Sequence, residues 1–208
     1  MYFQHNKEQS GEASIRHTLV VRPSDETIDT WINRPYVSNE LRGQLSAANV
    51  LLVPTEDEQA SRVYFPAGTE RFFRFLQTSE QQSLSVDICI GDKDYQELAL
   101  YADWLIIADL VVKVVVAPVV VYLICDYLEQ RLGRRAQTQV KSRLTIQETG
   151  SERSTIQIDY EGPASEYRDV ATEALTRDPE DSQKLNSGET NLQNTNELQE
   201  GRDAASKG

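Results

Sequence analysis

The sequence predicts a mixed α/β or α+β domain, in which a small layer of short strands and helices precedes a long central apolar helix and a C-terminal β-hairpin with one further helix. Three features of the 208-residue chain support this class. Short apolar runs alternate with helix-like segments over residues 16–91, residues 94–135 form a long apolar stretch, and residues 140–160 alternate between polar and apolar side chains. Strands that alternate with helices along a chain are typical of sheets with parallel pairs.

The first layer contains two helix starts with favourable N-cap residues. Ser24 precedes a helix expected at residues 25–33, and Ser38 precedes another at residues 39–47. The continuous apolar run at residues 49–53 predicts a strand buried on both faces. The other expected elements are a strand at 17–22, a charged loop at 56–61, an extended piece at 63–65, a helix at 70–77 capped by Thr69, and a strand at 83–90.

Charged residues interrupt the long apolar stretch. Its longest uncharged run, residues 114–125, has about a dozen residues, whereas a membrane-spanning helix needs about 20. We therefore expect a helix buried in the core. Asp109 and Lys113 are four residues apart with the acid first, which predicts an ion pair on one helix face. Pro118 is expected to kink or break this helix.

Two alternatives remain for this stretch. Aromatic residues flank residues 104–127 at both ends and arginines follow directly. This pattern also fits a helix that spans or dips into the inner membrane with its C-terminal side in the cytoplasm. The run VVKVVVAPVVV is rich in β-branched residues, which favours a strand for part of it.

The clearest local pattern lies near the C-terminus. Residues 140–147 and 154–160 alternate with period two around a polar turn, which predicts a β-hairpin. One face is apolar and needs a partner; it consists of Leu144, Ile146, Ile156 and Ile158. The opposite face, with Thr155 and Gln157, is expected to face solvent. A helix that ends near Leu175 follows, and we expect it to cover the hairpin and pack on the long helix.

The two ends of the chain are expected to lie outside the folded core. Residues 1–15 are polar and predict a flexible arm. Residues 177–208 lack aromatic groups and have few large apolar ones, so they cannot offset the entropy lost on ordering. We expect this acidic tail to be disordered, and residues 16–91 and 92–176 to share one core.

The composition restricts the compartment and the class of partner. The formal net charge of −12 repels phosphate backbones, so nucleic-acid binding is not expected. The first residues are polar and lack the apolar run of a signal peptide. Cys89 and Cys125 both lie in apolar stretches, as free buried thiols do. These features predict a cytoplasmic protein.

A short acidic segment follows the last strand of the first layer. Asp92, Asp94 and Glu97 are the candidate catalytic residues, because ligands gather at the carboxyl ends of strands and a buried carboxylate can move protons. Tyr95 lies beside them. Oxygen ligands for a divalent cation would come from this segment and Asp87. A solvated turn with Asp94 as a helix cap explains the same residues, and we expect no metal.

A second candidate is the helix start FPAGTE. Gly68 and Thr69 are the candidate cofactor-binding residues, because backbone N–H groups at a helix N-terminus attract anions. The segment has one Gly and no P-loop Lys, and Glu70 repels phosphate, so an ordinary turn and N-cap are expected instead. His5 and His17 lack neighbours at ligand spacing, so we expect neither a zinc site nor a cofactor.

The segment DKDYQEL, the apolar stretch ending in VVVYLICDYLEQRLGRR, the hairpin, and IDYEGP with its following helix occur in this order between residues 92 and 175. The order resembles that of small uncharacterised bacterial proteins, some of which belong to multi-component conflict or defence systems. The resemblance implies an accessory or interaction component and no catalytic residues.

The function expected from these observations is a non-enzymatic interaction or adaptor component with a protein partner, and a homo-oligomer is compatible with it. One alternative is a small enzyme or nucleotide-binding protein with an acidic site near residues 92–97. Another is a membrane-associated component with a single span through residues 104–127. The lack of His, Cys and Gly-rich signatures favours the interaction component.

Overall fold

The structure, a computed structural model, describes residues 17–57, 59, 62–79, 81, 83–99, 104–133, 137–148 and 155–176. The arm and the tail expected at the two ends lie outside these residues.

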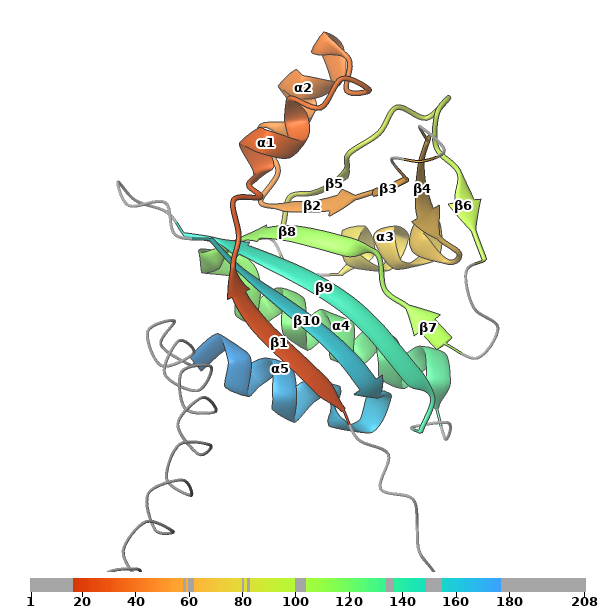
Figure 1. The fold of residues 1–208 in the computed structure, drawn as a ribbon, viewed down its shortest axis with the longest axis vertical. Coiled ribbons are helices and arrows are strands. Elements are labelled where there is room, and N and C mark those ends of the chain that lie inside the picture. Colours follow the sequence, from red (N-terminus) through yellow and green to blue (C-terminus); the bar gives the residue numbers. More distant parts are fainter. Residues whose placement is uncertain are drawn as a thin grey trace, which may run out of the picture.

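The chain is a mixed α/β protein with one seven-stranded and one three-stranded sheet (Figure 1). Its strands are β1 (Thr18–Pro23), β2 (Val50–Val53), β3 (Thr55–Asp57), β4 (Arg62–Pro66), β5 (Val86–Ile88), β6 (Glu97–Leu98), β7 (Trp104–Ile106), β8 (Asp109–Lys113), β9 (Gln139–Gln147) and β10 (Thr155–Pro163). Its helices are α1 (Ile28–Ile32), α2 (Asn39–Leu45), α3 (Thr69–Thr78), α4 (Ala117–Leu132) and α5 (Tyr167–Thr176), with 3-10 turns η1 (Val114–Val116) and η2 (Ala164–Glu166).

The larger sheet has the order β1-β10-β9-β8-β2-β5, and β7 pairs with β9. β9 and β10 form an antiparallel hairpin, and β1 adds to its outer side, also antiparallel. β8 and β9 are parallel and joined through α4, and β2 and β5 are parallel with α3 between them along the chain. Parallel strand neighbours need such crossover connections. The parallel pairing that the first layer predicts is confirmed by β2 and β5.

β2 lies between two apolar clusters. Its four residues are all buried. Val50 and Leu52 belong to the main core together with residues of α3, α4 and α5, whereas Leu51 and Val53 belong to a smaller cluster that includes residues of α1 and α2. The strand buried on both faces that residues 49–53 predict is therefore confirmed.

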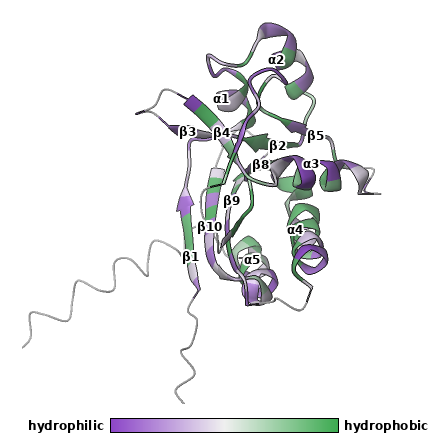
Figure 2. Ribbon diagram, turned by 90° about the vertical axis from the view of Figure 1, so that its right-hand side faces the viewer, coloured by the Kyte–Doolittle hydropathy of each residue, from purple (hydrophilic) through white to green (hydrophobic). Residues whose placement is uncertain are grey.

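The helices cover the two faces of the larger sheet unequally. α3, α4 and α5 lie on one side of it (Figure 2), and the buried apolar residues of α4 belong to the main core. On the other side, α1 and α2 lie near β2, and no helix lies over β1, β10 and β9 in the part of the chain that the structure describes (Figure 1). We call this uncovered surface, with Val20, Arg143 and Asp159, the open face.

The long apolar stretch does not form one helix, and that prediction is wrong. α4 begins only at Ala117, and the chain before it forms β6, β7 and β8. In β8, Leu110 and Val112 face the main core and Val111 faces the smaller cluster. A short apolar run buried on both faces cannot be told from a buried helix by periodicity. The strand alternative is the one that applies to residues 109–113.

Two detailed expectations for this stretch are corrected with it. Asp109 and Lys113 are the two ends of β8, and Asp109 pairs with Arg143 of β9 instead. Pro118 does not kink α4, because it occupies one of the first two helical positions, where its fixed φ suits the helix and its missing N–H costs nothing. None of the helices among the described residues has the length and apolar character needed to cross a bilayer.

The predicted hairpin is confirmed in position and in the face that it buries. Ile146 lies opposite Ile156, and Leu144 lies opposite Ile158. Ile156 is half-buried, the other three are buried, and all four pack in the main core. Val170 of α5 is buried in the same core, so the cover expected from the last helix is also confirmed.

The opposite side of the hairpin is less exposed than predicted. Thr155 is 4% exposed and Gln157 is 6% exposed. The chain between β1 and α1 passes over this end: the backbone N–H of Ser24 donates to the carbonyl of Thr155 (2.8 Å) and that of Ile28 donates to Gln147 Oε1 (3.0 Å). The prediction of solvent exposure is wrong because the covering segment lies far away in the sequence.

The short elements differ from those expected in their boundaries. Ser38 caps α2, as predicted, whereas Thr27 rather than Ser24 caps α1. β3 pairs with β4 and occupies the start of the loop expected at residues 56–61. β5 covers only the centre of the strand expected at residues 83–90.

Candidate functional site

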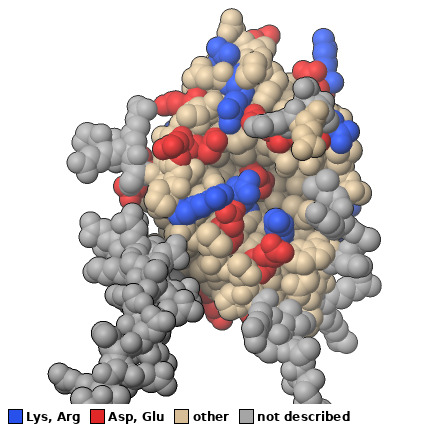
Figure 3. All heavy atoms as spheres, viewed as in Figure 1, with Lys and Arg blue, Asp and Glu red and all other residues tan. Residues whose placement is uncertain are grey.

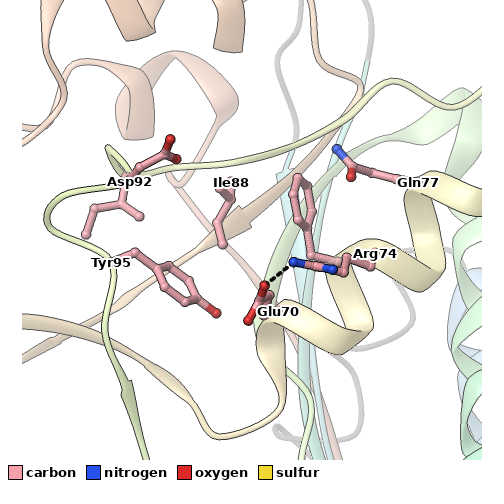
Figure 4. Close-up of a pocket in the computed structure, with 8 residues that line it drawn as sticks. Glu70, Arg74, Gln77, Ile88, Asp92 and Tyr95 are labelled. Atoms are coloured by element: carbon pink, nitrogen blue, oxygen red, sulfur yellow. Dashed lines mark hydrogen bonds and ion pairs between the residues drawn. The ribbon is translucent and has the colours of Figure 1, made fainter.

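A cleft opens between α3 and the carboxyl end of β5 (Figure 4). Its volume is about 640 Å³, within the range of roughly 300–1,000 Å³ that is common for ligand pockets. It is lined by Glu70, Phe73, Arg74, Gln77, Ile88, Ile90, Asp92 and Tyr95. We call it the α3–β5 cleft.

One side of α3 faces this cleft because of the spacing of its residues. Glu70, Arg74 and Gln77 are three or four positions apart and share a helix face, while the other side of the helix is buried in the main core. Asp92 and Tyr95 come from the segment after β5 and lie across the cleft from Arg74 and Gln77 (Figure 4). Two segments that are separate in sequence therefore form the two walls.

The cleft has an apolar floor and a charged rim. Phe73 and Ile88 are half-buried and Ile90 is buried. At the rim, Arg74 Nη2 donates to Glu70 Oε1 at 2.6 Å, and both side chains are exposed. An exposed ion pair of this kind adds little stability. Its two charges border an apolar surface that can bury a ligand group.

Glu97 occupies the N-terminus of α3. Its Oε2 accepts a hydrogen bond from the N–H of Gly68 and its Oε1 accepts one from the N–H of Glu70, both at 2.7 Å. Gly68 is the N-cap with φ of 95°, a left-handed conformation that favours glycine. Thr69 is the first helical residue rather than the cap, and its hydroxyl donates to Pro66. The sequence predicts an anion-binding helix N-terminus at Gly68 and Thr69. In the structure the carboxylate of Glu97 occupies this N-terminus.

Tyr95 and Glu97 form a pair whose pKa values both move away from neutral pH. The Tyr95 hydroxyl donates to Glu97 Oε1 at 2.6 Å. Burial, reinforced by this carboxylate, raises the pKa of Tyr95 above its ordinary value. Burial also acts to raise the pKa of Glu97, but the hydrogen bonds from Tyr95, Glu70 and Gly68 outweigh it and hold that pKa below its ordinary value.

The three acidic candidates do not converge on one point. Asp92 lines the cleft, Glu97 is bound to α3, and the N–H of Asp94 donates to the carbonyl of Gly91 within the turn. The helix that Asp94 is expected to cap does not form, because a turn and β6 follow. Among the described residues, no three His, Cys, Asp or Glu side chains are placed to hold a metal ion.

None of the histidines and cysteines that the structure describes is among the residues lining the cleft. His17 is bonded to Glu166 and links the start of β1 to η2, and His5 lies outside the described residues. Cys89 and Cys125 are free and buried, as the sequence predicts. Burial raises the pKa of Cys89 to about 12 and also raises that of Cys125, so both are unreactive thiols at neutral pH.

Sequence reasoning found the acidic wall of the cleft and missed its floor. Phe73, Ile88 and Ile90 read as ordinary core residues of a helix and a strand. The available signal was the side of α3 that carries Glu70, Arg74 and Gln77. This side of α3 indicates a cleft only when β5 lies next to the helix, and no local sequence pattern predicts that position of β5.

A second polar cluster lies on the open face, where acidic and basic side chains gather near the centre (Figure 3). Arg143 Nε donates to Asp159 Oδ1 at 2.8 Å, and its Nη1 donates to Asp109 Oδ2 at 3.2 Å. Arg22 Nη2 lies 3.5 Å from Asp159 Oδ2. Burial raises the pKa of Asp109 to about 6, although the positive charge of Arg143 acts to lower it.

The chain has no significant match among protein-family models, curated proteins or solved structures. Its function is therefore inferred from the geometry and chemistry of the cleft and the open face.

Proposed function

We propose that the protein is a non-enzymatic interaction component that holds an apolar side chain of a protein partner in the α3–β5 cleft. The observation that carries the proposal is the apolar floor of Phe73, Ile88 and Ile90, which the exposed charged side chains of Glu70, Arg74 and Asp92 border. Acid–base catalysis works best with a pKa near the working pH. Tyr95 lines the cleft and its pKa is raised, and the pKa of Glu97, to which the Tyr95 hydroxyl donates, is lowered.

The chemistry of the walls favours an apolar side chain that is followed or preceded by a basic residue. Phe73, Ile88 and Ile90 offer the surface on which the apolar group would be buried, and burial of such anchors supplies much of the affinity of protein interfaces. Asp92 is exposed at the rim and would attract the basic neighbour.

The other two candidate functions have less support. An enzyme or nucleotide-binding site near residues 92–97 that relied on Glu97 would need its carboxylate to be free, but that carboxylate accepts hydrogen bonds from two backbone N–H groups and from Tyr95. A single span through residues 104–127 would need a continuous helix, but this segment contains β7, β8 and the first part of α4.

Co-purification from native lysate with three tagged forms of the protein tests the proposal. Phe73→Glu places a charge on the apolar floor, and Asn39→Glu adds the same charge at the exposed start of α2. Wild type and Asn39→Glu should retain a stoichiometric protein partner that Phe73→Glu loses, while circular dichroism shows all three folded. Retention of that partner by folded Phe73→Glu would contradict the proposal.

A further inference from the structure

Another groove lies between the start of α3 and the end of α4. Its volume is about 590 Å³. Three of its lining residues are arginines: Arg71 and Arg74 of α3 and Arg131 of α4. Arg74 and its ion-pair partner Glu70, drawn in Figure 4, also line the α3–β5 cleft, so the two sites are adjacent. We call this second site the α3–α4 groove.

An aromatic contact holds the two helices together at this groove. Tyr127 of α4 is buried, and the centroid of its ring lies 4.9 Å from that of Phe72 and 5.3 Å from that of Phe75. Arg71 directly precedes Phe72 in the chain. Arg131 follows Tyr127 by four positions, so the two residues are neighbours on α4. Both arginines therefore border the same packed contact.

The charges of these two arginines act on the same buried group. Burial raises the pKa of Tyr127 above its ordinary value, while the positive charges of Arg131 and Arg71 both act to lower it. A charge shifts a pKa in this way when it lies close to the titrating group. Two guanidinium groups from different helices therefore lie near one point of the groove.

The fold does not account for a positive charge at Arg71. This residue lies in the first turn of α3, where the helix dipole favours negative groups. In the part of the chain that the structure describes, neither Arg71 nor Arg131 takes part in an ion pair or a side-chain hydrogen bond. Both are exposed, so a ligand can reach them. In a chain with a formal net charge of −12, these two unpaired arginines form a local basic site.

The acidic groups of the groove are already paired. Glu70 is paired with Arg74. The carboxylate of Glu97 accepts hydrogen bonds from two backbone N–H groups at the start of α3 and from Tyr95. Arginine binds carboxylates through charge-assisted hydrogen bonds, and arginines on two helices suit two carboxylates of an extended segment. A phosphate group would instead concentrate about two negative charges beside Glu70 and Glu97.

We propose that the α3–α4 groove binds an acidic peptide segment whose carboxylates pair with Arg71 and Arg131. This inference rests on the proposed function, because the acidic segment is the continuation of the partner segment whose apolar side chain enters the α3–β5 cleft. The partner then carries acidic residues on one side of that apolar side chain and a basic residue, facing Asp92, on the other.

NMR titration of the isotope-labelled full chain tests the groove by itself. The probes are acetylated and amidated hexaglutamate, hexaglutamine as its uncharged match, and inorganic phosphate, each at millimolar concentration and pH 7. Hexaglutamate should bind saturably and shift the side-chain Nε–H signals of Arg71 and Arg131, and added salt should weaken it because exposed charges are screened. Absence of saturable hexaglutamate binding, or equal binding of hexaglutamine or phosphate at these signals, would overturn the inference.

Variants of the groove identify the residues that hold the acid. Arg71→Gln and Arg131→Gln should each raise the Kd for hexaglutamate about fivefold, the upper range for an exposed ion pair. Arg62→Gln removes an exposed arginine of β4 that does not line the groove and should leave the Kd unchanged. Circular dichroism checks that the variants fold. Equal binding by wild type and both folded groove variants would overturn the inference.

Extended peptides separate this inference from the proposed function. Hexaglutamate carrying a leucine and a lysine through a short glycine linker, at either end, should bind wild type about tenfold more tightly than hexaglutamate in one of the two orders, as burial of a leucine side chain allows. Phe73→Ala should lose this gain and keep the binding of hexaglutamate. If Phe73→Glu loses the co-purified partner while Arg71→Gln and Arg131→Gln bind it as wild type does, the proposed function stands and this inference is wrong.

Discussion

Replacement of Asp109 by Asn should stabilise the protein at neutral pH. Burial raises the pKa of Asp109 from 3.8 to about 6, despite the opposing charge of Arg143, and its side chain is only 23% exposed. An acid with a raised pKa contributes most stability below its unfolded pKa and loses that contribution as the pH rises through the folded pKa. About two pKa units at about 1.4 kcal/mol each give a loss of about 3 kcal/mol between pH 4 and pH 7.

Denaturant unfolding of wild type and Asp109→Asn from pH 4 to pH 8 measures this loss. The two free energies of unfolding should be similar near pH 4, and the variant should be about 3 kcal/mol more stable at pH 7 and above. Glu161→Gln removes the same charge from an exposed residue of β10 and should show no such divergence. A constant difference between wild type and Asp109→Asn over this range, or a variant that is less stable at pH 7, would refute the reasoning.

Three further predictions follow from packing and capping. Ile158→Ala should lower the free energy of unfolding by about 2–4 kcal/mol in urea titrations, because this buried side chain packs in the main core; a loss below about 1 kcal/mol would contradict that packing. Glu97→Gln should cost about 0.5–2 kcal/mol at pH 7, as a lost helix cap does. Since the folded pKa of Glu97 is held below 4.5, this cost should shrink as the pH falls below that value, and a cost independent of pH would count against the cap. Gly162→Ala should destabilise by about 1–3 kcal/mol, because its Cβ would lie 2.6 Å from the Cβ of His17. Gly43→Ala, in open space within α2, should stabilise by about 0.5–1 kcal/mol. A Gly162→Ala variant that is more stable than wild type, or a Gly43→Ala variant that is less stable, would contradict these environments.

Elements whose pattern is local could be predicted from the sequence. The hairpin of β9 and β10 has period-two alternation around one polar turn, and its register places Ile146 opposite Ile156 as that pattern requires. Ser38 caps α2 through a bond to the N–H of Leu41, only three residues away. In each case the interacting residues are close enough in sequence for a single segment to contain the information.

Elements that depend on distant partners could not be predicted in the same way. β8 is a strand because β2 pairs with it on one side and β9 on the other, and residues 109–113 alone do not distinguish this from a buried helix. Thr155 is buried where the chain between β1 and α1 lies against it, with the N–H of Ser24 bonded to its carbonyl, and Gln157 on the same face is also buried.

The candidate site shows the same limit. Asp92 was identifiable because it follows a strand, and the structure does place it in the cleft. Glu97 is a candidate acid by sequence, yet its carboxylate binds the N-terminus of α3. The residue that it binds there, Glu70, precedes it by 27 positions. The apolar floor of Phe73 and Ile88 exists only because α3 and β5 lie side by side.

Photo-crosslinking at the rim of the α3–β5 cleft tests the central claim most directly. p-Benzoylphenylalanine incorporated at the exposed position Gln77 should crosslink, in native lysate, to the same protein that co-purifies with wild type. The mapped peptide should contain an apolar residue next to a basic one, and Phe73→Glu in the same chain should abolish the adduct. The probe at Asn39 on α2 should give no such adduct. Crosslinking of the co-purified partner from Asn39 but not from Gln77, or an undiminished adduct with Phe73→Glu, would contradict the assignment of the cleft as the partner site.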